Sequence, residues 1–308
     1  MAVSSRVTEH SASAGADSSL TIAGKLKDYY YLTKPGIVYS NTLTVISGYL
    51  FAAYRDVHGL LLLCLTFGTA LIIASACVSN NILDRNIDAR MKRTSNRALV
   101  IGSIGIRNAL FAATIMGIAG LILLSQTNNL TLIIGAFAFI SYVFVYGYAK
   151  RNSRHGTLIG TVPGAASLVA GYTAVTDKLD LTAGLLIVVM AAWQMAHFYA
   201  IAIFRLQDYK SAKIPVWPAI YGINNTKTFI YLYIALFGIS GIILGLVNRH
   251  NYILSCGMLA IGSWWFIRTW RSKEAEPAKW ARRTFGLSLV ALLVFIVILP
   301  LSVIISSL

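Results

Sequence analysis

The chain has 308 residues, of which 57% are hydrophobic and only 12% are charged, and its mean hydropathy is +0.69. Soluble globular domains average about 25% charged residues, so this composition excludes an ordinary soluble protein and indicates a polytopic membrane protein with short loops. The formal net charge of +15 is typical of basic cytoplasmic loops, and we predict no nucleic-acid partner.

The first 24 residues differ from the rest of the chain. They are rich in Ser and Ala and contain no apolar stretch of the kind that forms the centre of a secretory signal. We predict a short disordered tail over residues 1–24, followed by a single transmembrane domain over residues 25–308.

Apolar segments long enough to cross a ~30 Å hydrocarbon core as helices recur along the remainder of the chain. The sequence therefore predicts an all-α fold with nine transmembrane helices. The predicted spans cover residues 36–54, 59–82, 107–125, 130–149, 156–175, 181–203, 228–247, 252–269 and 285–305.

Lys and Arg concentrate in alternate connections between these spans. Basic residues precede the first span and follow the second, fourth, sixth and eighth, whereas the other connections carry few charges. Because short basic loops stay in the cytoplasm, we predict a cytoplasmic N-terminus. The loops after the second and sixth spans then fall on the same, cytoplasmic side.

The second predicted span ends in three polar residues placed one helical turn apart. At 3.6 residues per turn, Asn80, Asp84 and Asp88 project from one face of a helix. Two carboxylates in this relation repel each other, and Mg²⁺, which takes one or two carboxylates together with phosphate oxygens, is the candidate to offset that repulsion. The basic residues that follow and are suited to a diphosphate are Lys92, Arg93 and Arg97.

The loop after the sixth span carries a similar group. Asp208 stands among the cations Arg205, Lys210 and Lys213. The loop is either a solvated interfacial segment held by Asp–Lys pairs or the second half of the same site. Ionisable groups that converge at one membrane face are usually functional, which favours the second interpretation.

Several polar residues in or beside the spans have more than one interpretation. His197, in an apolar helix, could ligate or stack on a haem, act as an acid or base, or bond to a neighbouring helix. Lys34 either points at a phosphate or snorkels to the interface, and we favour snorkelling. Asn41 either bonds to another helix or helps to line the metal site. Lys150 and Arg151 are by default a topology signal.

These motifs resemble those of a known family. Asn80-xxx-Asp84-xxx-Asp88 resembles the first aspartate motif of the UbiA-type intramembrane prenyltransferases. The stretches DRNIDARMKRTSNR, KRNSRHGTLIGTVPGAA and WQMAHFYAIAIFRLQDYKSAKIPVWP are similar to the haem O synthase branch of that family, the protohaem IX farnesyltransferases. The resemblance runs from about Lys34 to Arg283, nearly the whole chain.

The resemblance implies a fold and a reaction. The helices would enclose a central cavity within a bacterial plasma (inner) membrane, with the active site facing the cytoplasm. Farnesyl diphosphate and protohaem would be the substrates, Mg²⁺ the cofactor, and haem O and diphosphate the products. The lipid bilayer would surround the protein, and haem A synthase or a terminal oxidase would be a candidate partner.

The resemblance also implies roles for individual residues. The implied metal ligands are Asn80, Asp84, Asp88 and Asp208, of which the three carboxylates are also the implied catalytic residues. The implied diphosphate-binding residues are Lys92, Arg93, Arg97, Lys150, Arg151, Arg205 and Lys213, and the implied haem contacts are His197 and Tyr199. Ala212 stands where the wider family has a second Asp four residues after Asp208, so we expect the first motif to carry most of the metal binding.

Three other interpretations remain open from the sequence. A polytopic transporter would also combine many spans with intramembrane polar residues, but the carboxylates here cluster at one membrane face and no internal repeat is evident. A quinone-type aromatic prenyltransferase would use the same diphosphate chemistry on another acceptor. The third is an assembly factor that binds haem but catalyses no reaction.

Overall fold

The computed structural model describes residues 21–54, 56–248 and 251–305. Every regular element in those ranges is helical and none is a strand, which confirms the predicted all-α fold. In chain order the elements are α2 (Ile22–Leu32), α3 (Pro35–Ala53), α4 (Gly59–Asp88), α5 (Ala98–Ile101), α6 (Ile106–Leu124), α7 (Asn129–Ile140), the π-helical turn η1 (Ser141–Tyr146), α8 (Gly147–Asn152), α9 (Gly156–Thr176), α10 (Leu181–Phe204), α11 (Leu206–Ser211), α12 (Trp217–Tyr221), α13 (Ile223–Val247), α14 (Tyr252–Trp270) and α15 (Pro277–Ile305).

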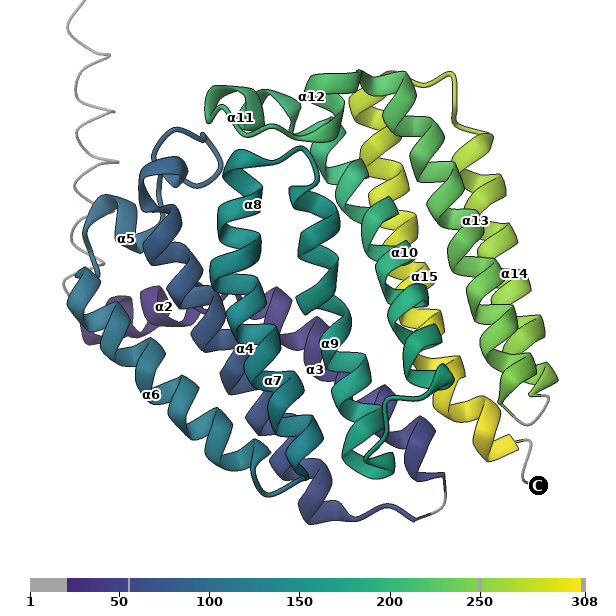
Figure 1. The fold of residues 1–308 in the computed structure, drawn as a ribbon. Coiled ribbons are helices and arrows are strands. Elements are labelled where there is room, and N and C mark those ends of the chain that lie inside the picture. The colour runs from purple at the N-terminus through teal and green to yellow at the C-terminus, as the bar shows by residue number, and fades with distance from the viewer. Residues whose placement is uncertain (1–20, 55, 249–250, 306–308) are drawn as a thin grey trace, which may run out of the picture.

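The long helices form one bundle in which successive helices run in opposite directions (Figure 1). The short helices α11 and α12 lie over one end of the bundle, and α15 finishes at the other end (Figure 1). Three of the helices that start at the end away from α11 and α12 are capped by polar side chains. The side chains of Asn128, Asp180 and Asn251 accept backbone N–H bonds at the starts of α7, α10 and α14.

Seven helical segments in the described part of the chain are long and apolar enough to cross a membrane, with η1 joining α7 and α8 into one of them. The two predicted spans that do not meet this criterion correspond to α3 and α14, which are 19 residues each. Both contain Ser, Gly and Tyr, and α14 also contains Trp. Their mean hydropathy is therefore lower than that of the seven other segments. The count of nine spans and the cytoplasmic N-terminus stay predictions.

The predicted spans match the apolar parts of the helices, but several helices extend beyond them: α13 starts at Ile223, α15 starts at Pro277, and α4 runs on at its end. The second span was expected to end at residue 82, but α4 continues to Asp88. In these extra turns Asp84 and Asp88 are buried, whereas Leu83, Arg85 and Asn86 are exposed. The segment that follows is bonded to this end of the helix: Arg85 Nε donates to the carbonyl of Leu99 at 2.8 Å, and Thr94 Oγ1 donates to the carbonyl of Asp88 at 2.9 Å. The whole Asn80–Asp88 motif therefore belongs to one helix.

The predicted N-terminal tail falls mostly outside the described residues, which begin at residue 21. The last part of it is helical, since α2 starts at Ile22. Thr21 caps that helix by accepting a hydrogen bond from the backbone N–H of Gly24 at 3.1 Å. Residues 22–24 of the tail predicted over residues 1–24 are therefore helical, and the part of it outside the described residues stays a prediction.

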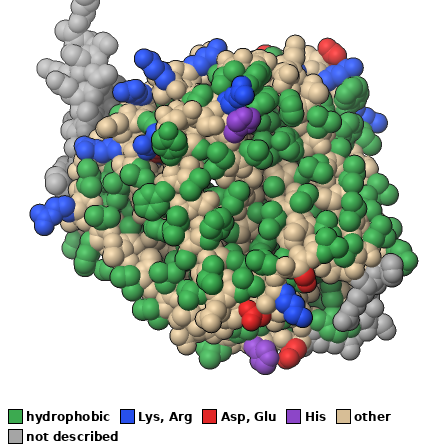
Figure 2. All heavy atoms as spheres, in the orientation of Figure 1, with side chains coloured by type: hydrophobic (Ala, Val, Ile, Leu, Met, Phe, Trp, Pro, Cys, Tyr) green, Lys and Arg blue, Asp and Glu red, His purple; other side chains and the backbone are tan. Residues whose placement is uncertain are grey.

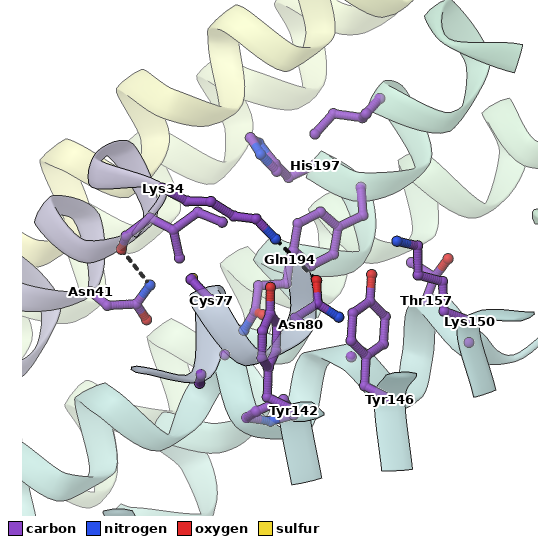
Figure 3. A pocket seen from close by; sticks show the side chains of 18 of the residues that line it. Lys34, Asn41, Cys77, Asn80, Tyr142, Tyr146, Lys150, Thr157, Gln194 and His197 are labelled. Atoms are coloured by element: carbon purple, nitrogen blue, oxygen red, sulfur yellow. Dashed lines mark hydrogen bonds between the residues drawn. The ribbon is translucent and has the colours of Figure 1, made fainter. Parts of the chain in front are cut away.

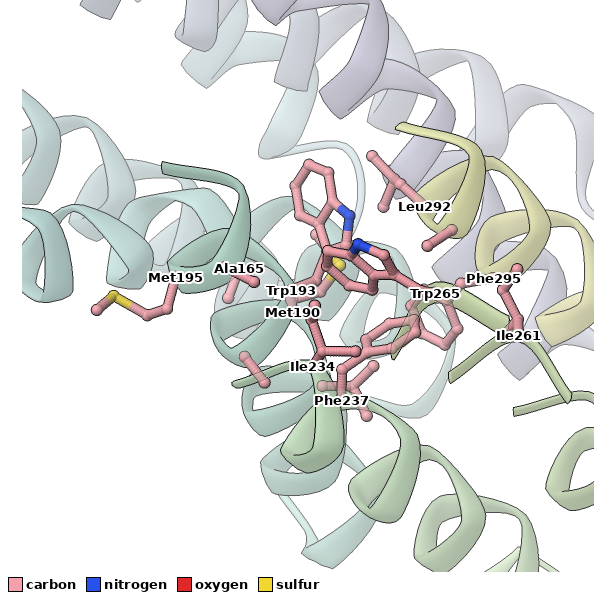
Figure 4. Close-up of a cluster of buried hydrophobic side chains, with 14 of the residues drawn as sticks. Ala165, Met190, Trp193, Met195, Ile234, Phe237, Ile261, Trp265, Leu292 and Phe295 are labelled. Atoms are coloured by element: carbon pink, nitrogen blue, oxygen red, sulfur yellow. The ribbon is translucent and has the colours of Figure 1, made fainter. Parts of the chain in front are cut away.

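The largest group of buried apolar side chains lies where α9, α10, α13, α14 and α15 meet (Figure 4). Trp265 and Phe295 are fully buried there, and Phe237 packs edge-on against both rings. Trp193 sits at the border of this cluster and also lines the main cavity of the protein. Packing of this half of the bundle therefore fixes one wall of that cavity.

The outer surface is apolar around the middle of the bundle. Figure 2 shows hydrophobic side chains over most of the visible face, with most of the Lys and Arg side chains near the end that carries α11 and α12. Large apolar side chains such as Phe111, Ile122 and Ile133 are more than half exposed. A surface of this kind is stable in lipid and not in water.

The packing of the N-terminal half of the bundle depends on a close approach between the backbones of α3 and α9. Small residues allow neighbouring helix backbones to come together in membranes. Both Gly48 on α3 and Gly171 on α9 face the backbone of the other helix so closely that neither site has room for a Cβ atom.

We expect Gly171→Val to separate α3 from α9 and to lower the free energy of unfolding by about 1–3 kcal/mol, a typical cost of overpacking. Unfolding in mixed micelles measures this. Gly184→Val is the matched control, because a Cβ at Gly184 meets nothing within 4 Å. Equal losses in the two variants would contradict the role given to the α3–α9 contact.

Candidate active site

A cavity of about 620 Å³ lies inside the bundle, between the polar end of α4 and the middle of α10. Its walls come from α3, α4, α7, η1, α8, α9, α10, α11 and α15, together with the segments that follow α4 and α11. One part of the wall carries the basic side chains Lys34, Arg93, Arg97 and Lys150. The remainder is largely apolar and aromatic, with Ile72, Phe139, Tyr142, Trp193, Phe198 and Leu292 among its members.

The three polar residues of α4 lie on one face of the helix and are all buried, with at most 2% of each residue exposed. Asn80 and Asp88 line the cavity. Asp84, between them, is covered by cations from α8 and is not part of the lining. The predicted shared face is confirmed.

Asp84 forms two ion pairs with consecutive residues of α8. Lys150 Nζ lies 2.7 Å from Asp84 Oδ2, and Arg151 Nη2 lies 2.9 Å from Oδ1. Lys150 and Arg151 were by default only a topology signal in the sequence. The structure pairs both of them with the carboxylate of Asp84, so they belong to the ion-pair network beside the cavity.

Asp88 is paired with Arg97, whose Nη1 lies 2.5 Å from Oδ2 and also donates to Asn81 Oδ1 at 3.1 Å. The segment after α4 folds back over the helix end to bring Arg97 there. Cations of the chain itself thus offset the repulsion between Asp84 and Asp88, and that repulsion does not by itself require a metal ion.

The side chains of α4 nevertheless suit a magnesium ion. Asp84 and Asp88 supply carboxylate oxygens one turn apart, and Mg²⁺ is normally held by one or two carboxylates with phosphate oxygens and water completing its shell. Asn80 Nδ2 is buried with no hydrogen-bond partner among the described residues, and this amide donor suits a phosphate oxygen, whereas Asn80 Oδ1, the atom able to ligate a metal, accepts from Lys34. No cluster of three or more His, Cys, Asp and Glu occurs in the described ranges, so phosphate oxygens would have to complete the shell.

Lys34 differs from the expectation that it snorkels to the interface. Its Nζ points inward and donates to Asn80 Oδ1 at 3.0 Å (Figure 3). The residue is the N-cap of α3 and has φ of 54°, a left-handed conformation just before Pro35 that turns the side chain toward α4. Burial lowers the pKa of Lys34 to about 8, which leaves the amine mainly charged at neutral pH.

Three tyrosines line the cavity that the sequence did not single out. Tyr142 and Tyr146 come from η1, stack with ring centroids 5.5 Å apart, and point into the cavity from the same wall (Figure 3). Tyr209 lines it from α11. The sequence signal was weak, because a four-residue spacing of aromatic residues near a helix end is also typical of an interfacial belt.

Two ambiguous residues are now placed. Asn41 bonds to another helix, the first alternative considered for it, because its Oδ1 accepts a hydrogen bond from Ser167 Oγ on α9 at 2.6 Å, and it also lines the cavity. His197 lines the cavity and its Nδ1 lies 2.7 Å from Ser288 Oγ on the neighbouring helix α15.

The structure brings about half of the expected site residues to the cavity wall. The expected residues that line it are Asn80, Asp88, Arg93, Arg97, Lys150 and His197. Those outside the lining are Asp84, Lys92, Arg151, Arg205, Asp208, Lys213 and Tyr199. Tyr199 is instead packed between Trp217 and Tyr233, with ring centroids 6.1 Å and 6.0 Å away.

Asp208, the expected partner of the α4 carboxylates, is not brought to them by any contact in the described residues. Its Oδ2 lies 3.8 Å from Arg205 Nη1, one turn earlier in the chain. Neither residue lines the cavity, whereas Ala202 and Tyr209, which flank the pair in the chain, do. Metal binding by Asp208 stays a prediction.

The UbiA prenyltransferase family matches residues 41–293. The chain belongs to this family. It is 43% identical over 270 residues to the protohaem IX farnesyltransferase of Cronobacter sakazakii, a match that covers 87% of this chain and 92% of that one. The enzymes of the same name from Salmonella arizonae and Yersinia pseudotuberculosis are also 43% identical, with similar coverage.

Two solved structures share this fold. A structure of digeranylgeranylglyceryl phosphate synthase superposes with a TM-score of 0.74 at 18% identity and covers 91% of this chain and 99% of that one. A UbiA homologue from Archaeoglobus fulgidus, bound to GPP and Mg²⁺, has a TM-score of 0.67 at 14% identity, with coverage of 88% and 99%. The chain is thus a multi-pass membrane protein of the UbiA family.

We expect Asp84→Asn to destabilise the protein, because it leaves the cations Lys150 and Arg151 without their common counter-charge. Breaking a buried pair typically costs about 3–5 kcal/mol. The control is Asp208→Asn, which removes one partly exposed pair worth about 0–1 kcal/mol. Unfolding in mixed micelles compares the two, and a smaller loss for Asp84→Asn than for Asp208→Asn would refute this account of the ion pairs.

Proposed function

We propose that this protein transfers the farnesyl group of farnesyl diphosphate to a vinyl group of protohaem, with addition of water, to give haem O and diphosphate. The relatives that are 43% identical over nearly their whole length bear the name of this activity. The observation that carries the proposal is the cavity itself, in which four basic side chains face an apolar and aromatic space. A prenyl diphosphate has the same division into an anionic head and an apolar chain.

The diphosphate lies at the basic part of the wall. Lys34, Arg93, Arg97 and Lys150 donate charge-assisted hydrogen bonds to it. Arg97 and Lys150 now pair with Asp88 and Asp84, so binding of the diphosphate redistributes these cations between the carboxylates and the substrate.

Asp84 and Asp88, with Asn80 beside them, would hold Mg²⁺. The A. fulgidus homologue was solved with GPP and Mg²⁺, which supports the use of a divalent cation in this family. When bound, the ion neutralises charge on the diphosphate and makes it a better leaving group. Asp208 lies outside the cavity wall, and its binding of the metal stays a prediction.

The chain drives ionisation by stabilising the leaving group. As the bond between C1 of the farnesyl group and the diphosphate oxygen breaks, its electron pair stays with that oxygen. The basic side chains are already fixed where this negative charge develops, which is the usual main source of catalysis in such sites. No side chain has to act as a strong base in this step.

The apolar walls protect the allylic cation that remains. Ile72, Phe139 and Leu292 exclude water from the apolar part of the cavity. The faces of Tyr142 and Tyr146 add attraction for positive charge. The cation therefore lasts long enough to meet the second substrate.

The second substrate, protohaem, supplies the electron pair of the new carbon–carbon bond. The π-electron pair of a protohaem vinyl group attacks C1 of the farnesyl cation, which leaves a positive charge on the carbon attached to the porphyrin ring. Water adds to that carbon and loses a proton to solvent or to the released diphosphate. Farnesyl diphosphate, protohaem and water thus give haem O and diphosphate.

We also propose that the protein lies in a bacterial inner membrane with the site open to the cytoplasm. The alternate placement of basic loops supports this orientation. The haem O that the protein makes would pass to an enzyme that modifies it further or to a terminal oxidase that binds it.

The test of this function is the reaction itself. Membranes containing the protein should convert protohaem and farnesyl diphosphate to a more hydrophobic haem with release of diphosphate, and EDTA should stop turnover until Mg²⁺ is restored. Aromatic acceptors of the quinone type should not compete. Prenylation of such an acceptor in place of protohaem would identify an aromatic prenyltransferase, and absence of any product with Mg²⁺ present would overturn the proposal.

Lys34 gives a sharper test of where the diphosphate lies. We expect Lys34→Met to lower kcat/KM for farnesyl diphosphate by about 10–100-fold, the effect of losing a charged hydrogen bond worth about 1.5–3 kcal/mol. The KM for protohaem should change little. Lys178→Met, at an exposed position in the connection before α10, is the control, and equal effects of the two substitutions would count against a diphosphate contact at Lys34.

A further inference from the structure

His197 is a buried histidine whose surroundings are almost entirely apolar. It lies in the middle of α10 and is 8% exposed. Its ring is stacked on Trp193, with centroids 4.8 Å apart, and contacts Phe285 at 4.7 Å. It lines the cavity on the side across from Tyr142 and Tyr146 (Figure 3). A polar ring in such a place needs a partner for each nitrogen.

The partner of Nδ1 determines the position of the proton on the ring. Ser288 Oγ lies 2.7 Å from Nδ1 of His197 and 2.6 Å from the carbonyl oxygen of Phe285. A carbonyl oxygen can only accept a hydrogen bond, and a serine hydroxyl has one proton. That proton is therefore donated to Phe285, and Ser288 Oγ accepts from His197, so Nδ1 carries the hydrogen.

The other nitrogen then presents a lone pair. With its proton on Nδ1, a neutral imidazole has an unprotonated Nε2. No residue in the described part of the chain makes a hydrogen bond to Nε2, and the residue borders the cavity. A 180° flip of the ring would place a carbon where Nδ1 now lies and would lose the Ser288 bond. The indole Nε1 of Trp193 in turn donates to the carbonyl oxygen of Ser288 at 2.7 Å.

We infer that His197 Nε2 binds the iron of the protohaem acceptor as an axial ligand, an inference that rests on protohaem being a substrate. A metal-binding histidine commonly donates its other N–H to an oxygen that fixes its orientation, and Ser288 provides that oxygen. The apolar side chains around the ring, such as Trp193, Phe198 and Leu292, match the apolar face of a porphyrin. The lone pair forms a coordinate bond, and the oxidation state of iron is unchanged.

The geometry disfavours the other polar part of protohaem as the partner. A propionate is anionic and accepts hydrogen bonds, whereas an unprotonated Nε2 can donate none. A lone pair facing a carboxylate would be repelled. The same nitrogen has no proton to give, so His197 does not act as a general acid in this tautomer.

Ligation at this point would orient the second substrate. The iron would be held on α10, and the porphyrin edge could then reach the side of the cavity where Lys34 and Lys150 hold the diphosphate. Ser288 is in this account a positioning residue, because it acts on the iron only through the tautomer of His197.

Resonance Raman spectroscopy of the full-length protein with ferrous protohaem tests the inference. We expect an iron–nitrogen stretching band that shifts when the protein carries ¹⁵N-labelled histidine. His197→Phe keeps the aromatic packing with Trp193 and Phe285 but removes the nitrogen, so the band should disappear and protohaem binding should weaken by at least about ten-fold. His155→Phe, outside the cavity wall, should change neither.

Two further variants separate ligation from folding and from orientation. In His197→Gly, added imidazole should restore the band, which a purely structural role would not allow. Ser288→Ala should weaken protohaem binding by about ten-fold and lower the frequency of the band, because outer hydrogen bonds tune metal ligands. Binding of farnesyl diphosphate should be retained in all of these variants and reports that they are folded.

The outcomes distinguish this inference from the proposed reaction. A histidine-sensitive band that survives in His197→Phe, while the wild-type protein makes haem O, would overturn the ligand and leave the reaction in place. Loss of the band in His197→Phe, from a protein that makes no haem O, would support the ligand and overturn the reaction. Absence of a histidine-sensitive band in the wild-type protein would also overturn the ligand.

Discussion

The buried ion pairs at the end of α4 are the interaction on which the rest of the site depends. Asp84 is held by two cations of α8, and Asp88 by Arg97 from the segment after α4. Burial of charge in a membrane protein is costly unless partners are close, so these contacts fix where α8 and that segment must lie. They also keep several cations next to the cavity, where a polyanionic substrate can compete for them.

The cavity has two parts because two halves of the bundle build it. The polar part comes from the start of α3, the end of α4, α8 and the segment that returns over α4. The apolar part borders the large cluster between α9 and α15. A substrate that is anionic at one end and apolar along the rest is matched by this arrangement. The histidine of α10 stands in the apolar part, held by α15.

Local patterns in the sequence predicted the helices and the shared face of Asn80, Asp84 and Asp88, because both depend on helical periodicity and hydropathy alone. They did not predict that Lys34 turns inward, since that depends on a left-handed residue before Pro35 and on a partner 46 positions away. Asp208 was expected beside the α4 carboxylates from loop charge, but charge in a loop does not define the direction of a side chain. The place of Tyr142 and Tyr146 depends on a π-helical turn, which hydropathy cannot reveal.

The π-helical turn η1 makes the site sensitive to the number of residues between α7 and α8. In a regular helix each residue adds about 100° of rotation, and a π-helical turn accommodates an extra residue. The turn η1 therefore sets the phase between α7, which packs against α9, and α8, whose Lys150 and Arg151 must reach one carboxylate. Removal of a single residue from η1 would rotate α8 away from Asp84 while leaving every side chain of the site intact. The number of residues in this turn is as much a part of the site as their identity.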